Sequence, residues 1–117
     1  MNVDVLFAGV AVTEFEQARA WYERFFGRAP DIVANDEEVM WQLAGASWLY
    51  IVSDTQHAGN SIVAMAVSNI ETATSGLEAR GVTTGPIEKE GEAGLKALVR
   101  DPDGNSIAII EVAGRRG

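Results

Sequence analysis

The sequence predicts an α+β domain made of two copies of one βαβββ unit of about 55 residues. Each copy shows a short apolar run, then a helix with a clear start and stop, then three short strand candidates. With 117 residues, 47% of them hydrophobic, the chain suits one compact core and no second domain. We therefore expect a single domain over 1–117, comprising module one at 1–54, a linker at 55–60, module two at 61–112 and a tail at 113–117.

The first module opens with an apolar run at 5–12 that lacks helical spacing, as expected for a strand covered on both faces. Thr13 and Glu16 then match a capping box, so we expect the first helix to begin there. Gly27 supplies the left-handed position that ends this helix. Its apolar stripe is formed by Phe15, Ala18, Tyr22 and Phe25.

Three strand candidates complete the first module, at about 31–34, 38–43 and 47–53. They are separated by the turn formers Asn35-Asp36 and Gly45-Ala46. A polar linker follows, after which the same order of elements begins again.

The second module repeats the plan at an offset of 55 residues. Ser68 takes the capping place of Thr13, and Gly81 ends the second helix. Its apolar stripe is formed by Ile70, Ala73 and Leu77. The strands after it are expected at about 83–89, 95–100 and 106–112. A ferredoxin-like βαββαβ arrangement also has two helices, but it would leave surplus strands between them.

The last two strands are joined by the segment Asp101-Pro102-Asp103-Gly104-Asn105. Asp and Pro suit the first two positions of a type I turn, and Gly104 can adopt a positive φ. The segment therefore predicts a tight hairpin.

Composition excludes several kinds of site and partner. With no cysteine and only His57, the chain cannot form disulfides, thiolate sites or sites built from several imidazoles. A net charge of −8 makes nucleic acids and anionic membranes unsuitable partners. The same acidity suits a cationic ligand, although a solvated acidic surface is the simpler explanation. The start of the chain has no leader pattern and no run approaches the ~18 apolar residues of a membrane span, so we expect a cytoplasmic protein.

Trp21-Tyr22 and Gly27 after the first strand, together with the 101–105 hairpin, give the chain a resemblance to a known family. Over roughly residues 3–112 the sequence resembles the glyoxalase/bleomycin resistance/extradiol dioxygenase (vicinal oxygen chelate) superfamily. The resemblance implies a curved mixed sheet around a central cleft, with both helices on the outside. It also implies a divalent metal on the cleft floor, as in glyoxalase I and extradiol dioxygenases, while antibiotic-resistance proteins share the same scaffold.

In the metal-dependent members, His, Gln or Glu occupies one point on the first and the last strand of each module. The corresponding positions here are Phe7, Tyr50, Ile62 and Ala108. None of them offers an imidazole or a carboxylate, and Tyr50 is at best a weak phenolic ligand. We therefore expect no metal and no other cofactor. An error of one residue in this register would bring Asp or Glu side chains into the cleft only if each strand also reversed its two faces. Such a reversal would bury charged groups and expose apolar ones.

Strand alternation defines a candidate ligand-binding cleft. Its predicted lining is Phe7, Trp48, Tyr50, Ile62, Ala64, Ala108 and Ile110. Trp41 is a further candidate, either stacking on a ligand or covering the cleft mouth, unless it packs into the sheet. Aromatic rings beside small residues suit a flat apolar or amphipathic ligand, unless the same side chains fill the cleft as core. Glu111 and the 88–90 segment carry carboxylates that we assign to protection of strand edges.

The leading functional hypothesis is a metal-independent protein that binds a small molecule without transforming it, resembling bleomycin-resistance-type members. One alternative is a glyoxalase-like lyase, isomerase or dioxygenase with non-standard residues, such as Tyr50 as an acid or base. Another is a protein with a filled cleft that acts through its surface. Because exposed sheet edges and paired modules favour self-association, we also expect a homodimer.

Overall fold

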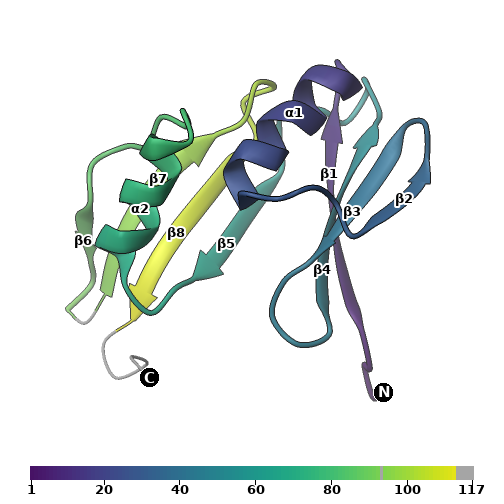
Figure 1. Ribbon diagram of the computed structural model, residues 1–117. Coiled ribbons are helices and arrows are strands. Elements are labelled where there is room, and N and C mark those ends of the chain that lie inside the picture. Colours follow the sequence, from purple (N-terminus) through teal and green to yellow (C-terminus); the bar gives the residue numbers. More distant parts are fainter. Residues whose placement is uncertain (93, 113–117) are drawn as a thin grey trace.

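The computed structural model describes residues 1–92 and 94–112 and contains two four-stranded sheets, each with one helix (Figure 1). The elements in chain order are β1 (Leu6–Val12), α1 (Phe15–Phe26), β2 (Ile32–Asn35), β3 (Glu38–Gln42), β4 (Ser47–Ser53), β5 (Ile62–Ala66), α2 (Ile70–Ala79), β6 (Glu88–Glu90), β7 (Gly94–Arg100) and β8 (Ser106–Val112). The predicted α+β fold of two βαβββ modules is confirmed. The predicted tail at 113–117 lies outside the described residues.

The two sheets have the same topology. Their strand orders are β1-β4-β3-β2 and β5-β8-β7-β6. In each sheet the first strand pairs in parallel with the last strand of its module, and the other pairs are antiparallel. Within the described residues, no strand of one sheet pairs with a strand of the other. The duplication seen in the sequence is therefore a duplication of structure.

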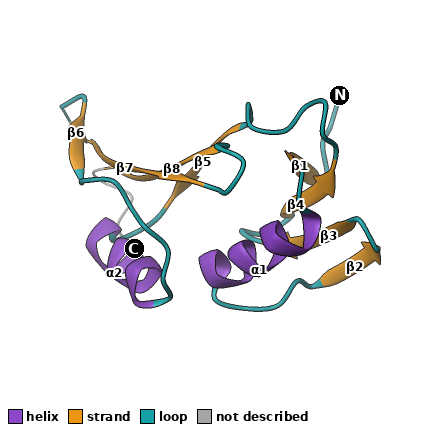
Figure 2. Cartoon of the chain, turned by 90° about the horizontal axis from the view of Figure 1, so that it is seen from above, coloured by secondary structure: helices purple, strands orange, loops and turns teal. Residues whose placement is uncertain are grey.

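Both helices lie on one side of the molecule and leave the opposite face of each sheet uncovered (Figure 2). The apolar core lies between the helices and the sheets, because the helical stripes and alternate strand residues point toward each other. Its largest fully buried side chains include Trp41, Tyr22, Leu49, Ile51, Ile70 and Ile107. In the described part of the chain, neither helix is long and apolar enough to cross a membrane.

The first helix begins later than the capping box predicts. Glu14 occupies the N-cap position without a side-chain cap, and the helix starts at Phe15. Thr13 instead donates from its backbone amide and from its hydroxyl to the carboxylate of Asp103, at 3.1 and 2.6 Å. The prediction failed because a carboxylate from the second module takes the groups that the local cap would use.

The second helix is capped by Asn69 and not by Ser68. The Asn69 side chain accepts a hydrogen bond from the Thr72 amide at 3.0 Å. Glu111 also contributes, since its buried carboxylate accepts from the Ile70 amide at 2.8 Å. A carboxylate at a helix N-terminus is favourable because it meets unpaired amides and the positive end of the helix dipole. Glu111 is therefore a structural cap, which corrects its assignment to edge protection.

The strand predicted at 83–89 is the least accurate element. Only Glu88–Glu90 pairs as a strand, and the preceding segment is irregular. Pro86 has no amide hydrogen to donate to a ladder, and the chain before it contacts β7 through one Gly85 amide donating to the Leu98 carbonyl at 2.8 Å. The other strands for which a range was predicted match it to within one or two residues.

The hairpin at 101–105 adopts the predicted tight turn, with Gly104 at φ 91°. Asp101 and Asn105, exposed by only 5% and 1%, form a polar junction between the two modules. The Asp101 carboxylate accepts from the hydroxyl of Tyr22 at 2.8 Å, from the Asn105 side-chain amide at 2.8 Å and from two hairpin amides at 2.9 Å. Asn105 donates to the Ala11 carbonyl at 3.0 Å and accepts from the Ser61 amide at 2.9 Å.

Burial and the neighbouring Asp101 carboxylate raise the pKa of Tyr22 well above its ordinary value of 10.0. In the unfolded chain the phenol loses its proton first as the pH rises above about 10, so folding stability falls there. Below that pH both states keep the proton, and this contribution to stability is fully present.

We predict that Tyr22→Phe lowers the free energy of unfolding at neutral pH by about 1–3 kcal/mol, because it removes a buried hydrogen bond to a carboxylate. Above pH 10, the wild type should lose stability more steeply than the variant, by up to about 1.4 kcal/mol per pH unit. Urea denaturation at several pH values measures both effects. Thr84→Val, which removes an exposed hydrogen bond to Glu78, is the matched control and should change stability by less than about 0.5 kcal/mol. Equal pH slopes in wild type and Tyr22→Phe would contradict the assignment.

Candidate functional site

The uncovered face of the first sheet carries an aromatic surface. Phe7 on β1 lies beside Trp48 on β4, and their rings are stacked with centroids 6.1 Å apart and planes 24° apart. Phe7 is 52% exposed, and Trp48 is half-buried. The adjacent cross-strand pair is Gly9 with Tyr50. We call these four residues the aromatic face.

The ring of Tyr50 lies directly over Gly9. A Cβ atom at Gly9 would lie 2.4 Å from Cζ and 2.5 Å from the hydroxyl oxygen of Tyr50, which is shorter than any normal contact. The missing side chain therefore lets the phenol rest against β1. Within the described residues, no protein group accepts or donates a hydrogen bond at this hydroxyl. The face thus combines stacked rings with one polar group that is held in place and still able to bond.

The uncovered face of the second sheet is small and aliphatic. Ile62 and Ala64 on β5 are exposed, Ile62 by 86%, while Ala108 and Ile110 on β8 are half-buried. Ala64 lies opposite Ala108 in the parallel ladder. We call these four residues the small face. In both sheets, the predicted cleft residues on the first and last strands of the module lie on the side away from the helices. The predicted alternation of these strands is therefore the one observed.

The two faces belong to separate sheets of the chain. The aromatic face comes from β1 and β4, and the small face from β5 and β8. Their use as a common ligand-binding cleft stays a prediction.

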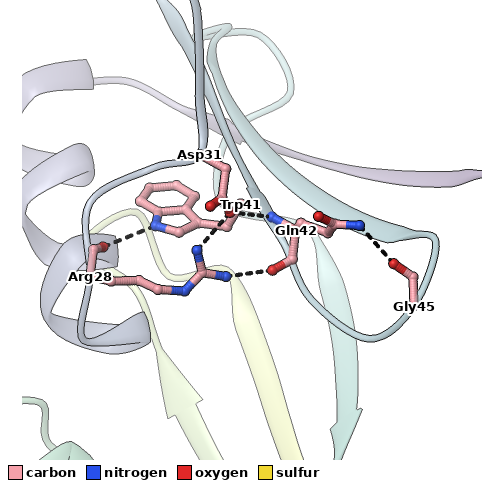
Figure 3. A network of polar contacts seen from close by, with 5 residues as sticks. All are labelled: Arg28, Asp31, Trp41, Gln42 and Gly45. Carbon is pink, nitrogen blue, oxygen red and sulfur yellow. Dashed lines mark hydrogen bonds and ion pairs between the residues drawn. The ribbon is translucent and has the colours of Figure 1, made fainter.

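Trp41 does not lie on either face, which corrects its selection as a ligand-stacking candidate. It is fully buried on the helix side of β3, with its ring centroid 5.1 Å from that of Phe26 and 6.2 Å from that of Tyr22. Its indole nitrogen donates to the Arg28 carbonyl at 3.0 Å (Figure 3). Alternation along β3 explains the placement, because Val39 and Trp41 point to the core while Met40 points away.

A polar network supports Trp41 from outside the core (Figure 3). The Arg28 guanidinium donates to the Asp31 carboxylate at 2.6 Å and to the Gln42 carbonyl, and Asp31 accepts from the Gln42 amide at 2.7 Å. These hydrogen bonds lower the pKa of Asp31 below its ordinary value. The network fixes the α1–β2 connection to the end of β3, so its role is structural.

The four positions that the resemblance predicts as metal-ligand positions do not offer a ligand set for a metal here. Phe7, Ile62 and Ala108 have no donor atom, and the Tyr50 phenol alone is a poor ligand for a divalent ion. Across residues 1–92 and 94–112 there is no group of three or more His, Cys, Asp or Glu side chains placed to bind a metal. His57 lies in the linker, where its Nδ1 is 2.8 Å from Asp54 and lowers the pKa of that carboxyl.

Comparisons with known proteins agree with this architecture. The family model described as the glyoxalase/bleomycin resistance protein/dioxygenase superfamily matches residues 5–109. A glyoxalase/bleomycin resistance protein from Catenulispora acidiphila is 38% identical, with a TM-score of 0.87, and the match covers 92% of this chain and 97% of that one. No curated protein matches the sequence.

More distant solved structures share the fold. An antibiotic binding protein from a Streptomyces species is 19% identical, with a TM-score of 0.77 and coverage of 96% of this chain and 98% of the other. A lactoylglutathione lyase from Agrobacterium tumefaciens is 16% identical, with a TM-score of 0.76 and coverage of 95% of each chain. At these identities the likeness concerns the fold alone. The family model and the 38% identical relative show that the chain belongs to the glyoxalase/bleomycin resistance protein/dioxygenase superfamily.

Proposed function

We propose that the protein binds a flat apolar or amphipathic small molecule on the aromatic face and the small face, and that it does so without a metal. The proposal is carried by the residues Phe7, Tyr50, Ile62 and Ala108, which occupy the positions predicted to match the superfamily's metal ligands. Aromatic and aliphatic side chains stand where metal-dependent members have imidazole, amide or carboxylate ligands. Such side chains suit contact with an organic molecule better than coordination of an ion. The likeness to an antibiotic binding protein supports this direction, within a family that also contains enzymes.

The chemistry of the two faces sets the class of ligand. The stacked rings of Phe7 and Trp48 present an extended aromatic surface on which a planar molecule can stack. The Tyr50 hydroxyl beside them can hydrogen-bond one polar group of the ligand, and such single polar contacts orient ligands in apolar sites. The alanine side chains of the small face leave space for a bound molecule. A planar ligand with one polar edge fits this combination best.

A homodimer would complete the site. Phe7 and Ile62 are 52% and 86% exposed in the single chain, so each face lacks a second wall. Exposed apolar clusters of this kind mark interfaces or ligand sites. We infer that two copies pair so that the aromatic face of one chain opposes the small face of the other and encloses the ligand between them.

An enzymatic role for Tyr50 is the second candidate, and the unbonded hydroxyl favours it. A phenol can serve as a general acid or base when its substrate lies within hydrogen-bonding distance. Turnover of a bound compound that is lost in Tyr50→Phe, with binding retained, would identify this role.

We predict that protein treated with a chelator and then dialysed keeps its ligand binding. A thermal-shift screen of planar aromatic compounds should give a ligand that, at a hundred times its Kd, stabilises the chain by about 2.7 kcal/mol, or about 10 °C. Trp48→Ala should abolish the shift because it removes half of the stacked pair. Val33→Ala is the control, since Val33 is exposed but lies opposite Val39 on the helix side of the sheet. Stoichiometric Ni, Zn, Fe or Mn in untreated protein, with binding that needs it, would refute the proposal.

We predict that Gly9→Ala disturbs the site through Tyr50. The added methyl group overlaps the phenol ring, so the variant should lose about 1–3 kcal/mol of stability and bind the screened ligand at least tenfold more weakly. In a Tyr50→Ala background, Gly9→Ala should lower the free energy of unfolding much less. A double-mutant cycle followed by chemical denaturation measures this coupling between the two positions. Gly76→Ala is the control, because its Cβ would lie 3.4 Å from the nearest side-chain atom, at the edge of ordinary contact. Equal costs in both backgrounds would show that Gly9 does not position Tyr50.

We predict that Ile62→Asp converts a dimer into a monomer. Because Ile62 is 86% exposed in the single chain, the substitution should leave the fold intact while placing a charge in the proposed interface. Sedimentation velocity measures the assembly, and circular dichroism checks the fold. Val33→Asp, on the other side of the first sheet, should remain dimeric. A wild-type chain that sediments as a monomer at high concentration would contradict the paired arrangement.

A further inference from the structure

A groove of about 740 Å³ opens between the two modules, on the side where the helices lie. Its walls come from the C-terminal end of α1, the start of β1 and β4, and the facing surfaces of β5 and α2. Its apolar lining includes Phe25, Phe26, Val63, Met65, Ala73 and Leu77. Trp48 and Ala64 also line it, but the other residues of the aromatic face and the small face do not. The volume lies within the range of about 300–1,000 Å³ typical of small-molecule sites.

Arg80 is the only charged side chain among the described residues that line this groove. This is notable in a chain with 17 acidic and 9 basic residues, because the one charge that the groove offers is positive. A guanidinium only donates hydrogen bonds, so it attracts anions and disfavours cations.

The Arg80 guanidinium is fixed in position. Its Nε donates to the Arg24 carbonyl at 2.5 Å and its Nη2 donates to the Phe25 carbonyl at 2.8 Å, both at the C-terminal end of α1. Its third nitrogen, Nη1, has no hydrogen-bond partner within the described residues. This atom is near Gly76, another groove residue, at 3.4 Å from the position that a Cβ would occupy. The lining of the groove therefore includes one donor that is held in place and has no protein acceptor within the described residues.

We propose that this groove is a second ligand site and that it takes an amphipathic carboxylate. The apolar part of the ligand lies between Phe26, Met65 and Leu77, and its carboxylate accepts a charge-assisted hydrogen bond from Nη1 of Arg80. A single negative charge is favoured over a multiply charged group such as phosphate. The α1 carbonyls already offset part of the guanidinium charge, and the chain as a whole carries −8.

The site is tested with three probes that share one alkyl chain: octanoate, 1-octanol and octylammonium. In a titration followed by ¹⁵N NMR, octanoate should shift the amides of Met65, Ala73 and Leu77 with little effect at Phe7 and Ile62. Because a hydrogen bond to a charged group is worth about a factor of ten or more, octanoate should bind about tenfold more tightly than 1-octanol. Octylammonium should bind more weakly than either.

Two variants separate charge from shape. Arg80→Gln should remove the preference for octanoate and leave the affinity for 1-octanol within about twofold, which also verifies that the groove persists. Ala73→Trp should fill the groove and abolish binding of both probes. Arg100→Gln is the matched control, because Arg100 bonds Ser106 on the second sheet and does not line the groove.

Three results would overturn the proposal. The first is a set of octanoate shifts confined to the aromatic face and the small face. The second is an Arg80→Gln variant that weakens octanoate and 1-octanol equally. The third is a dimer in which the groove amides respond to dilution and not to octanoate, because a second copy would then occupy the groove. The second and third results do not depend on whether the aromatic face binds a ligand of its own.

Discussion

The buried carboxylate of Asp101 fixes how the two modules of this chain meet. It lies in the last hairpin of the second module, where it accepts hydrogen bonds from the amides of its own turn. It also accepts a hydrogen bond from the hydroxyl of Tyr22, on the first helix of the other module. Asn105 extends the junction to the end of β1 and to the residue before β5. Within the described residues, no strand of one sheet pairs with a strand of the other. The hydrogen bonds of these side chains therefore fix the orientation of the two modules, which strand pairing would fix in a continuous sheet.

The first helix is held by the second module at both of its ends. At its start, Asp103 binds Thr13, and at its finish, Arg80 binds the carbonyls of Arg24 and Phe25. Charges of these signs suit the positive and negative ends of a helix dipole. The helices are therefore kept together on one side of the molecule (Figure 2), and this arrangement leaves the other face of each sheet open. The position of the candidate site follows from this placement.

Periodicity predicted the parts of the structure that depend on local pattern. The 55-residue repeat, the helical stripes and the strand alternation gave the topology and placed Phe7, Tyr50, Ile62 and Ala108 on the uncovered faces. One error arose where a distant residue competes with local ones, and another where a local pattern was not applied. Thr13 was predicted to cap its own helix but bonds Asp103, which is 90 residues away. Trp41 was predicted as a candidate ligand contact, although alternation within β3 alone would have placed it with the buried Val39. The groove at Arg80 has no sequence pattern, because two modules create it together.

The difference between the two modules matters as much as their likeness. Equivalent positions carry Phe7 and Tyr50 in the first module and Ile62 and Ala108 in the second, so one face is aromatic and the other is small. Two sheets that pack face to face lie about 10 Å apart, and their inner side chains fill that distance. Two aromatic faces would leave no room, and two small faces would leave nothing for a ligand to stack on. In the proposed dimer, an aromatic face opposed to a small one would leave space between the sheets, and for this reason the sequence divergence of the duplicated modules favours a planar ligand.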